Sequence, residues 1–420
     1  MAKRCLIVTY YFPPTGGGGV QRNVKLIKYL SRKNWKFTVV TSNGNDTNLS
    51  LDESLKSDLP EEVEVVKIAN SDGKANSRFS ALIKSTFLVR FISSFLFVPD
   101  RHKKWIKSAK KKIVEIIDSK KIDLILISSP PYSLVMLASE LTREQSIPVV
   151  LDMRDPWTTN PYKIYPSSWH FKQDSKIETE NIKQIKYGIS AYKSLLGFYE
   201  ESVEDFKTNN WQYIPNGYDE EDFKSLIPQK FEDNKFHIAF SGTFYSHINK
   251  PMFLLKGIAA VEKPLRDKIC FHHIGDSAIN LKKIARRYGL ENNIIEWGYQ
   301  DHNSCLNILA GMDALCFILD SSNKNSDKTI GGKVYEYLRL EKPILALTPL
   351  KGESATIINE TNAGIVIKPT DHKQIAKTVT SMASSPEKNK SNKNITIFER
   401  SNLAKQYYEF FNQTLSENIK

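Results

Sequence analysis

The sequence alternates between short apolar runs and segments with helical spacing from its first residues onward. Residues 5–10 have the pattern of a buried strand, 20–31 have apolar side chains at helical spacing, and 35–41 are again strand-like. Continuous apolar strands separated by helices are typical of a parallel sheet that is covered on both faces, because neither face of such a strand meets water. The alternation therefore predicts an α/β chain with a doubly wound sheet.

The same alternation restarts near residue 236, after the polar segment 216–234. Further strands are predicted at 63–68, 122–128, 148–152, 236–241, 268–274, 294–297, 314–319 and 343–347, and further helices at 103–119, 132–145, 251–261, 280–288, 305–310 and 333–340. A chain of 420 residues is long enough for two to three domains. We therefore expect two doubly wound domains, 1–215 and 216–394, followed by the segment 395–420, whose apolar spacing is that of an amphipathic helix.

The composition, charge and cysteine content limit the class of protein and the kinds of ligand that the chain can bind. Hydrophobic residues make up 40% and charged residues 25%, which excludes a disordered or collagen-like chain. The net charge of +12 favours anionic partners, namely phosphates, nucleic acid or an anionic membrane surface, without choosing among them. The four cysteines have neither CxxC nor zinc-finger spacing, so buried reduced thiols are expected rather than a metal cluster.

The longest apolar stretch, 87–98, has 12 residues and contains Arg90, whereas a membrane span needs about 20. No signal peptide is recognisable, and we expect a cytoplasmic chain. Seven Lys or Arg residues follow directly in 101–112. They form either a solvated helix face or, together with the apolar residues of 87–112, a patch that lies on anionic lipid at the inner face of the cell membrane. No nucleic-acid recognition motif is present.

The loop 13–19 contains four consecutive glycines directly before a predicted helix. In open α/β sheets ligands bind beyond the carboxyl ends of the strands, where helix N-termini offer free N–H groups to anions. With two such sheets, we expect a phosphate-bearing ligand in a cleft between facing domains. Gly18 and Gly19 would let the backbone approach this ligand, unless the loop is only a flexible turn. The loop matches neither the dinucleotide fingerprint nor a P-loop.

The segment Asp152–Trp157 follows another predicted strand of the first half. Asp155 suits a proton acceptor or a contact to a sugar hydroxyl, and Arg154 suits a phosphate contact or a group that orients Asp155. The alternative is an Arg–Asp pair that only secures the loop. The spacing of the two aspartates is too common to imply a metal site.

Two segments of the second half suggest phosphate contacts. Gly242 and Thr243 end the first predicted strand there, and Lys250 precedes the next helix, which suits a diphosphate but equally a strand end with a surface lysine. Lys333 lies in the first turn of a helix, where a cation is unfavourable without an anion nearby. Glu336 follows on the same side and suits a ribose diol, or else it caps its own helix.

Several of these segments occur in an order that is known from one enzyme family. They are Tyr11–Pro14 with the glycine loop, Asp152–Trp157, Ile214–Asp219, Phe240–Thr243 and Lys333–Pro343. From residue 5 to about 415 the chain resembles bacterial GT-B glycosyltransferases, and most closely the retaining family 4 in its surface-polysaccharide branch. The resemblance implies two facing Rossmann-like domains and a C-terminal helix, within 395–420, that crosses back to the first domain.

The resemblance also implies roles for the candidate residues. The second domain would bind a nucleotide-sugar donor, with Glu336 on the ribose and the base near Trp297, Gly298 and Tyr299. The residues implied at the diphosphate are Gly242, Thr243 and Lys250, with Lys333 as an addition and Gly18 and Gly19 approaching from the first domain. Asp155 and Arg154 correspond to acceptor-side or catalytic groups. Neither a cofactor nor a divalent metal is implied.

Two positions depart from the family pattern. Lys328 stands eight residues before Glu336, where the family has a glutamate, and Thr243 replaces an arginine. The sequence therefore predicts a metal-independent glycosyltransferase of the hexosyltransferase type that moves a sugar, with UDP as the favoured carrier, to a saccharide or lipid-linked saccharide during surface-polysaccharide biosynthesis. The alternatives are a nucleotide-sugar epimerase of the same fold and an inactive sugar-nucleotide-binding scaffold. An NAD-dependent dehydrogenase fits poorly, because the glycine fingerprint is missing.

Overall fold

The computed structural model describes residues 2–44, 51–69, 94–244, 250–319, 325–384 and 395–418. Their contacts divide the chain into two compact units. Within the described ranges, the first unit consists of residues 2–217 and 398–418, and the second of residues 218–397. The beginning of the predicted apolar patch, 87–93, lies outside the described residues.

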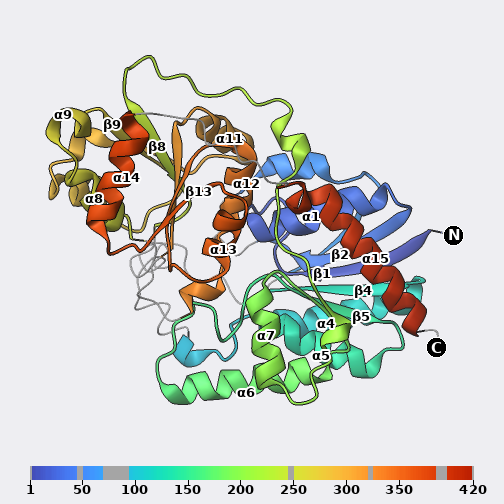
Figure 1. Ribbon diagram of the computed structural model, residues 1–420. Coiled ribbons are helices and arrows are strands. Elements are labelled where there is room, and N and C mark those ends of the chain that lie inside the picture. Colours follow the sequence, from blue (N-terminus) through green and yellow to red (C-terminus); the bar gives the residue numbers. More distant parts are fainter. Residues whose placement is uncertain are drawn as a thin grey trace. The chain divides into compact units, whose positions relative to one another are not determined.

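The first unit is built on a parallel sheet (Figure 1). In spatial order its described strands are β3 (Glu64–Ile68), β2 (Trp35–Ser42), β1 (Lys3–Thr9), β4 (Leu124–Ser129), β5 (Val149–Met153), β6 (Tyr187–Ser190) and β7 (Trp211–Tyr213). Its described α-helices are α1 (Gly18–Ser31), α4 (Lys103–Ser119), α5 (Ser133–Glu144), α6 (Ser168–Gln184), α7 (Lys193–Ser202) and α15 (Arg400–Asn418). The order 3-2-1-4-5-6 is that of a Rossmann fold, here with one further strand.

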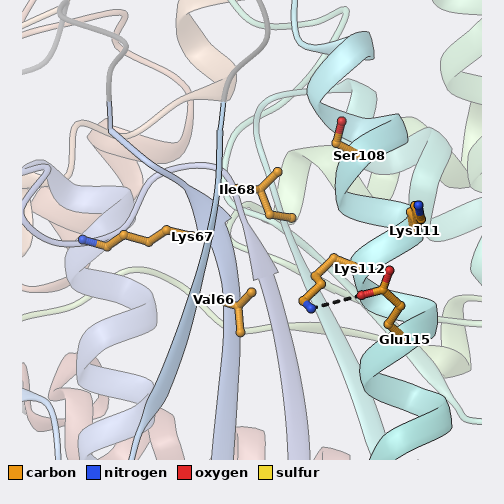
Figure 2. A pocket seen from close by; sticks show the side chains of 7 residues that line it. All are labelled: Val66, Lys67, Ile68, Ser108, Lys111, Lys112 and Glu115. Atoms are coloured by element: carbon orange, nitrogen blue, oxygen red, sulfur yellow. Dashed lines mark hydrogen bonds and ion pairs between the residues drawn. The ribbon is translucent and has the colours of Figure 1, made fainter.

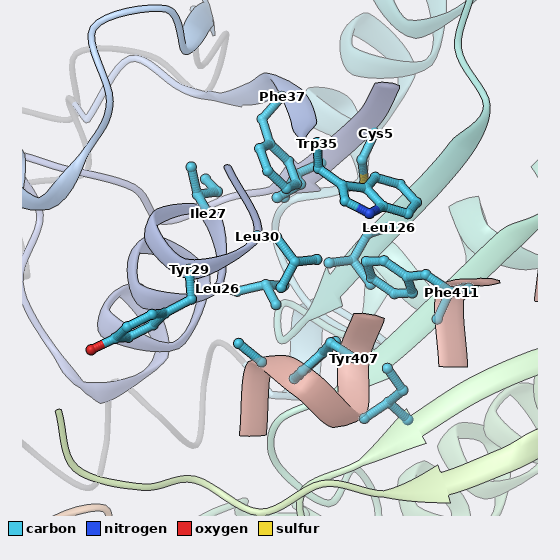
Figure 3. Close-up of a cluster of buried hydrophobic side chains, with 14 of the residues drawn as sticks. Cys5, Leu26, Ile27, Tyr29, Leu30, Trp35, Phe37, Leu126, Tyr407 and Phe411 are labelled. Atoms are coloured by element: carbon cyan, nitrogen blue, oxygen red, sulfur yellow. The ribbon is translucent and has the colours of Figure 1, made fainter. Parts of the chain in front are cut away.

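The C-terminal helix α15 belongs to the first unit and packs against α1. Figure 3 shows the apolar cluster between them, in which the Trp35 and Phe411 rings lie 5.4 Å apart. The chain leaves this unit after Gly217 and returns at Phe398, and a Cβ on Gly217 would lie only 1.9 Å from the Phe398 carbonyl oxygen. The predicted return of the last helix to the first domain is thus confirmed.

The second unit repeats the same topology. In spatial order its described strands are β10 (Ile294–Gly298), β9 (Ile269–Ile274), β8 (Phe236–Ser241), β11 (Ala314–Ile318), β12 (Ile344–Leu347) and β13 (Gly364–Ile367). Its described α-helices are α8 (Met252–Ala259), α9 (Lys263–Arg266), α10 (Leu281–Arg286), α11 (His302–Ala310), α12 (Lys333–Leu340), α13 (Glu353–Glu360) and α14 (His372–Ser384). Strands β8, β9 and β11 are buried along their whole length, which agrees with their near-continuous apolar sequences.

The predicted alternation is therefore confirmed in both halves. Helix α4 has the predicted bounds, and its Trp105, Ile106 and Ile113 are buried while most of its lysines are exposed. Every helix within the described ranges is too short or too polar to cross a bilayer.

Candidate functional site

In the first unit, the glycine loop and the segment after β5 meet at the start of α1. A Cβ on Gly19 would lie 1.4 Å from Nη1 of Arg154, so the guanidinium lies directly against the backbone of Gly19. Arg154 is 5% exposed, and its Nη2 donates to the Pro130 carbonyl at 2.6 Å. A Cβ on Gly18 would meet no atom within 4 Å. The structure thus brings Gly19 and Arg154 together, and only glycine leaves room for the arginine.

Arg154 has the properties of an anion-binding group. Burial lowers the pKa of its guanidinium, and the neighbouring Asp155 carboxylate acts against this change. Its Nε is a buried N–H group without a hydrogen-bond partner among the described residues. The first turn of α1 contains no acidic residue. A buried N–H donor beside a helix N-terminus suits a phosphate or a carboxylate.

Asp155 is half-buried beside this arginine. The hydroxyl of Tyr192 donates to its Oδ1 at 3.3 Å. Burial raises the pKa of the Asp155 carboxyl, while Arg154 and the Tyr192 hydrogen bond oppose that increase. A carboxyl group with a raised pKa is suited to accept a proton or a sugar hydroxyl at neutral pH.

Asp152 is bound by a different arginine. Both of its oxygens accept from Arg22, at 2.8 and 2.9 Å, and the hydroxyl of Tyr407 donates to it at 3.1 Å. Arg22 also donates to the carbonyls of Ile214 and Pro215, each at 2.9 Å. Arg22 and Asp152 are both buried. This network joins β5, α1, α15 and the end of the first unit, so Asp152 has a structural role.

The loop that follows Arg154 is held by buried aromatic and acidic side chains. The rings of Tyr132 and Trp157 stack at 5.3 Å, and the Lys163 ammonium lies 4.8 Å from the Tyr132 ring. Asp174 on α6 pairs with Lys163 and accepts from the indole N–H of Trp157 at 3.0 Å. These contacts fix the loop that carries Arg154 and Asp155.

Glu178 lies one turn further along α6. Its buried carboxyl group should make the stability of the first unit depend on pH. Burial raises its pKa to about 7, although Thr158 and Tyr199 donate hydrogen bonds to it. Between its ordinary pKa and pH 7 the folded protein therefore binds more protons than the unfolded chain, and stability falls as pH rises through this range. We expect a loss on the order of 3 kcal/mol between pH 4.5 and 8.

Urea unfolding at several pH values measures this effect. The variant Glu178→Gln keeps the side-chain shape without the ionisation and should have a much flatter profile, whereas Glu180→Gln on the exposed face of α6 should resemble the wild type. An unchanged slope in Glu178→Gln would contradict the assignment.

In the second unit, glycines end three neighbouring strands. Gly242, Gly275 and Gly298 follow or end β8, β9 and β10 with φ values of 151°, 136° and 68°. A Cβ on Gly275 would lie 2.5 Å from the Gly242 carbonyl oxygen. Backbones therefore approach closely at this edge of the sheet, beside the point where the strand order reverses. Thr243 and Lys250 are half-buried, and 245–249 between them lie outside the described residues.

Lys333 and Glu336 form an ion pair in the first turn of α12. Lys333 Nζ donates to Glu336 Oε2 at 2.7 Å, and Glu336 is 5% exposed. Burial disfavours the charge of Lys333, but the Glu336 carboxylate outweighs it and raises the lysine pKa. The cation at this helix N-terminus, which we expected to need a phosphate, is thus already neutralised by Glu336 of its own helix.

A histidine and a second carboxylate form a chain of contacts that ends at Glu336. His302 Nδ1 lies 3.8 Å from Glu336 Oε1, and its Nε2 lies 3.1 Å from Asp222 Oδ2. All three side chains are buried or half-buried. This chain of contacts orients the Glu336 carboxylate. Sequence reasoning missed Asp222 and His302, because neither belongs to a local motif.

Other contacts connect the end of β8 with α12. The hydroxyl of Tyr337 accepts from the Ser241 N–H at 2.8 Å, and Ser241 Oγ lies 3.2 Å from Cys305 Sγ. Tyr299 is 41% exposed and close enough to Lys333 to contribute to its raised pKa. The structure therefore brings Tyr299, Lys333 and Glu336 together. Gly242 directly follows Ser241, whose backbone N–H donates to the Tyr337 hydroxyl.

Trp297 belongs to a hydrogen-bond chain that runs through two buried histidines. Its indole N–H donates to His272 Nδ1 at 3.0 Å, His272 Nε2 lies 2.9 Å from His237 Nδ1, and His237 Nε2 lies 2.7 Å from Asp233. Burial and the neighbouring His237 lower the pKa of His272 to about 4. His237, His272 and Cys270 are also close enough to hold a metal ion. A metal on His272 Nε2 would leave a proton on Nδ1 facing the indole N–H, so the residues fit the hydrogen-bond chain better.

A separate cavity of about 300 Å³ lies between edge strand β3 and α4 of the first unit. Figure 2 shows Val66, Ile68 and Lys112 among its lining residues, with Lys112 paired to Glu115 at 3.0 Å. None of the predicted site residues lines it.

Two Rossmann-like units followed by a helix that returns to the first unit define the GT-B fold. Residues 222–396 match the family model described as "Glycosyl transferases group 1". The second unit therefore has the fold of a group 1 glycosyl transferase domain. No curated protein matches the sequence.

Solved structures of the same fold extend over the whole chain. Sucrose-phosphate synthase from Thermosynechococcus elongatus superposes with a TM-score of 0.71 at 11% identity, covering 99% of this chain and 100% of that one. WaaG, a glycosyltransferase involved in lipopolysaccharide biosynthesis, gives 0.59 at 12% identity and covers 99% and 98%. A putative UDP-N-acetylglucosamine 2-epimerase from Listeria monocytogenes gives the same values. At these identities the likeness shows the fold.

Proposed function

We propose that the protein is a glycosyltransferase that uses a nucleotide-sugar donor bound by the second unit. The observation that carries the proposal is the buried Glu336 carboxylate beside Lys333 at the N-terminus of α12, within the region that matches group 1 glycosyl transferases. A carboxylate accepts two hydroxyls of a ribose, and an ammonium group binds the adjacent diphosphate.

Donor binding requires an exchange of partners at this pair. When the ribose diol occupies the Glu336 oxygens, Lys333 moves from Glu336 to the diphosphate, where the glycine edge at Gly242 permits close approach and Lys250 adds a second cation. The base stacks near Tyr299. These groups then stabilise the negative charge that develops on the departing diphosphate, and this stabilisation supplies most of the rate enhancement.

The first unit supplies the acceptor side. Arg154, beside Gly18 and Gly19 at the start of α1, contributes a cation and free N–H groups for a phosphate, and Asp155 receives the acceptor hydroxyl. We expect neither a cofactor nor a divalent metal, because lysine, arginine and helix N-termini perform the charge neutralisation.

The finer assignment rests on the motif resemblance. It favours a retaining transferase of family 4 with a UDP-linked donor and a saccharide or lipid-linked saccharide acceptor in surface-polysaccharide biosynthesis. The fold likeness to WaaG is consistent with this role. The fold likeness to the putative 2-epimerase favours an epimerase as the second candidate. An epimerase converts the donor without an acceptor, so incubation with UDP-sugars alone distinguishes the two reactions.

Ligand-dependent thermal stabilisation against UDP, GDP, ADP, CMP and NAD tests the proposed donor site. A ligand present at about 100 times its Kd adds roughly 2.7 kcal/mol, which shifts Tm by several degrees. Stabilisation by one nucleoside diphosphate supports the transferase and identifies the base. Stabilisation by NAD, or by none of them, contradicts the proposal.

The variant Glu336→Gln should bind this nucleoside diphosphate at least tenfold more weakly. A charged acceptor of two ribose hydroxyls is replaced by a neutral amide, and hydrogen bonds to charged groups contribute about 1.5–3 kcal/mol each. Isothermal titration measures the Kd, and Glu360→Gln at the end of α13 is the matched control. An unchanged Kd in Glu336→Gln would remove Glu336 from the ribose contact.

A further inference from the structure

The buried Glu336 carboxylate has a basic neighbour at each of its oxygens. Lys333 Nζ lies 2.7 Å from Oε2, and His302 Nδ1 lies 3.8 Å from Oε1. Helices α11 and α12, which carry these side chains, lie side by side in the second unit (Figure 1). Two groups that can carry positive charge therefore face one carboxylate.

The two neighbours differ in their freedom to leave the carboxylate. The Lys333 side chain is 31% exposed, whereas those of His302 and Glu336 are 6% and 7% exposed. The lysine is long and reaches water, so it can turn toward a bound diphosphate. The imidazole is fixed at its other end, because its Nε2 lies 3.1 Å from Asp222 Oδ2. When Lys333 leaves, His302 therefore stays beside Glu336.

The proton position on His302 follows from its acidic partners. An ionised carboxylate only accepts hydrogen bonds, so a neutral imidazole carries its proton on Nε2, facing Asp222. Nδ1 then presents a lone pair toward Glu336 Oε1, and 3.8 Å is too long for a hydrogen bond. One further proton on Nδ1 would turn this contact into a charge-assisted hydrogen bond.

Donor binding, as proposed above, changes the charge balance of this cluster. Ribose hydroxyls donate hydrogen bonds to Glu336 but carry no charge, and the charge of Lys333 passes to the diphosphate. A buried carboxylate that loses its cation is strongly destabilised. An imidazole becomes a cation near neutral pH by taking up one proton. His302 is thus able to replace the charge that Glu336 loses.

The ionisable groups on the elements that carry these contacts are mostly acidic. They are Asp219, Glu220, Glu221 and Asp222 in and before the turn Glu220–Phe223, Lys333, Glu336 and Arg339 on α12, and Asp301 and Cys305 in and before the first turn of α11. Arg339 is paired with Glu220, and burial raises the pKa of the Cys305 thiol, which therefore stays neutral. Once Lys333 turns away, carboxylates supply the charge close to His302.

We propose that His302 is a positioning residue of the donor site that takes up one proton when the nucleotide binds. The proton comes from solvent and goes to Nδ1, from which the imidazolium donates to Glu336 while Nε2 continues to donate to Asp222. The cluster that Lys333 leaves thereby keeps its net charge. The inference rests on the proposed function, because it needs a nucleotide that draws Lys333 away.

Isothermal titration calorimetry in two buffers tests the proton uptake. The full-length protein is titrated at about pH 7.5 with whichever of UDP, GDP and ADP stabilises it most, since a terminal phosphate is ionised at this pH. Because the buffer supplies the proton, uptake makes the measured enthalpy differ between Hepes and Tris. We expect this difference in the wild type and not in His302→Gln, whose amide still donates to Asp222 but does not ionise.

The pH dependence of the Kd separates this role from a purely structural one. His302→Gln should bind the nucleotide about tenfold more weakly than the wild type near pH 7, and the gap should close toward higher pH as the wild type loses the imidazolium. A structural defect would weaken binding by the same factor at every pH. Asp222→Asn should reduce the proton uptake as well, and it replaces His302→Gln if that variant does not fold.

The matched control is His372→Gln, which removes a histidine of the second unit that belongs to α14. It should show the proton uptake and the Kd of the wild type. Equal enthalpies of the wild type in both buffers, or unchanged uptake in His302→Gln and Asp222→Asn, overturn the inference and leave the donor site in place. Absence of stabilisation by every nucleotide contradicts the proposed function and this inference with it, so the two failures are distinct.

Discussion

Asp152→Ala is expected to lower the free energy of unfolding of the first unit by about 3–5 kcal/mol, because it leaves the buried guanidinium of Arg22 without its carboxylate. Arg22 keeps the carbonyls of Ile214 and Pro215 as acceptors, but these are neutral. Tyr407 loses its acceptor as well. The effect should exceed that of most single substitutions, since those cost 0.5–3 kcal/mol.

Urea unfolding monitored by near-UV circular dichroism measures this change. The double variant Arg22→Met with Asp152→Leu removes both charges and should recover much of the loss, because apolar replacements of a buried ion pair are often neutral. Lys183→Met, which breaks the exposed pair with Glu204, is the control and should change stability by less than 1 kcal/mol. A loss below 1 kcal/mol in Asp152→Ala would show that the network does not hold the unit together.

Gly19→Ala is expected to lower kcat/KM for sugar transfer about 100-fold while leaving the unit folded. The added methyl group would lie 1.4 Å from Arg154 Nη1, so the guanidinium must move away from the start of α1. A displacement of about 1 Å at a reacting centre costs on the order of 100-fold in rate. The fold tolerates the change, because alanine favours helix and the displaced atoms end a flexible side chain.

Gly197→Ala in α7 is the matched control for this variant. A Cβ there meets nothing within 4 Å, and Gly197 lies outside the candidate site. It should retain full transfer activity and gain up to 1 kcal/mol in stability. Activity in Gly19→Ala equal to that of the control would mean that Arg154 does not take part in transfer.

The fold followed from the sequence wherever the apolar pattern is strong. The strand 5–10 is an almost continuous apolar run, and 268–274 contains the apolar stretch 269–271 followed by Ile274. Both predicted strands lie within one or two residues of the observed β1 and β9. Helix α6 and strand β6 were not predicted. The helix buries mostly polar residues, so its apolar spacing is misleading, and β6 has four residues with a glycine in second place.

The candidate site was predictable where its residues share a short motif. Gly18, Gly19, Arg154, Lys333 and Glu336 each follow a strand or open a helix, and the topology carries such positions to the carboxyl edge of a sheet. Arg22 and His302 were missed because their partners are distant in the sequence. Asp152 is 130 residues from Arg22, and Asp222 is 80 residues from His302. Only the folded backbone places these charges side by side.

The close approach of Gly217 to Phe398 means that the second unit could be removed without cutting the first unit in two. Because the polypeptide departs and re-enters at one point, residues 218–397 are topologically an insertion into an otherwise complete Rossmann unit. A short peptide bridge from 217 to 398 preserves every strand and helix of the host, including α15. The excised insert retains its own six-stranded sheet among its described residues, so we expect that each of the two units can be expressed as a separate polypeptide.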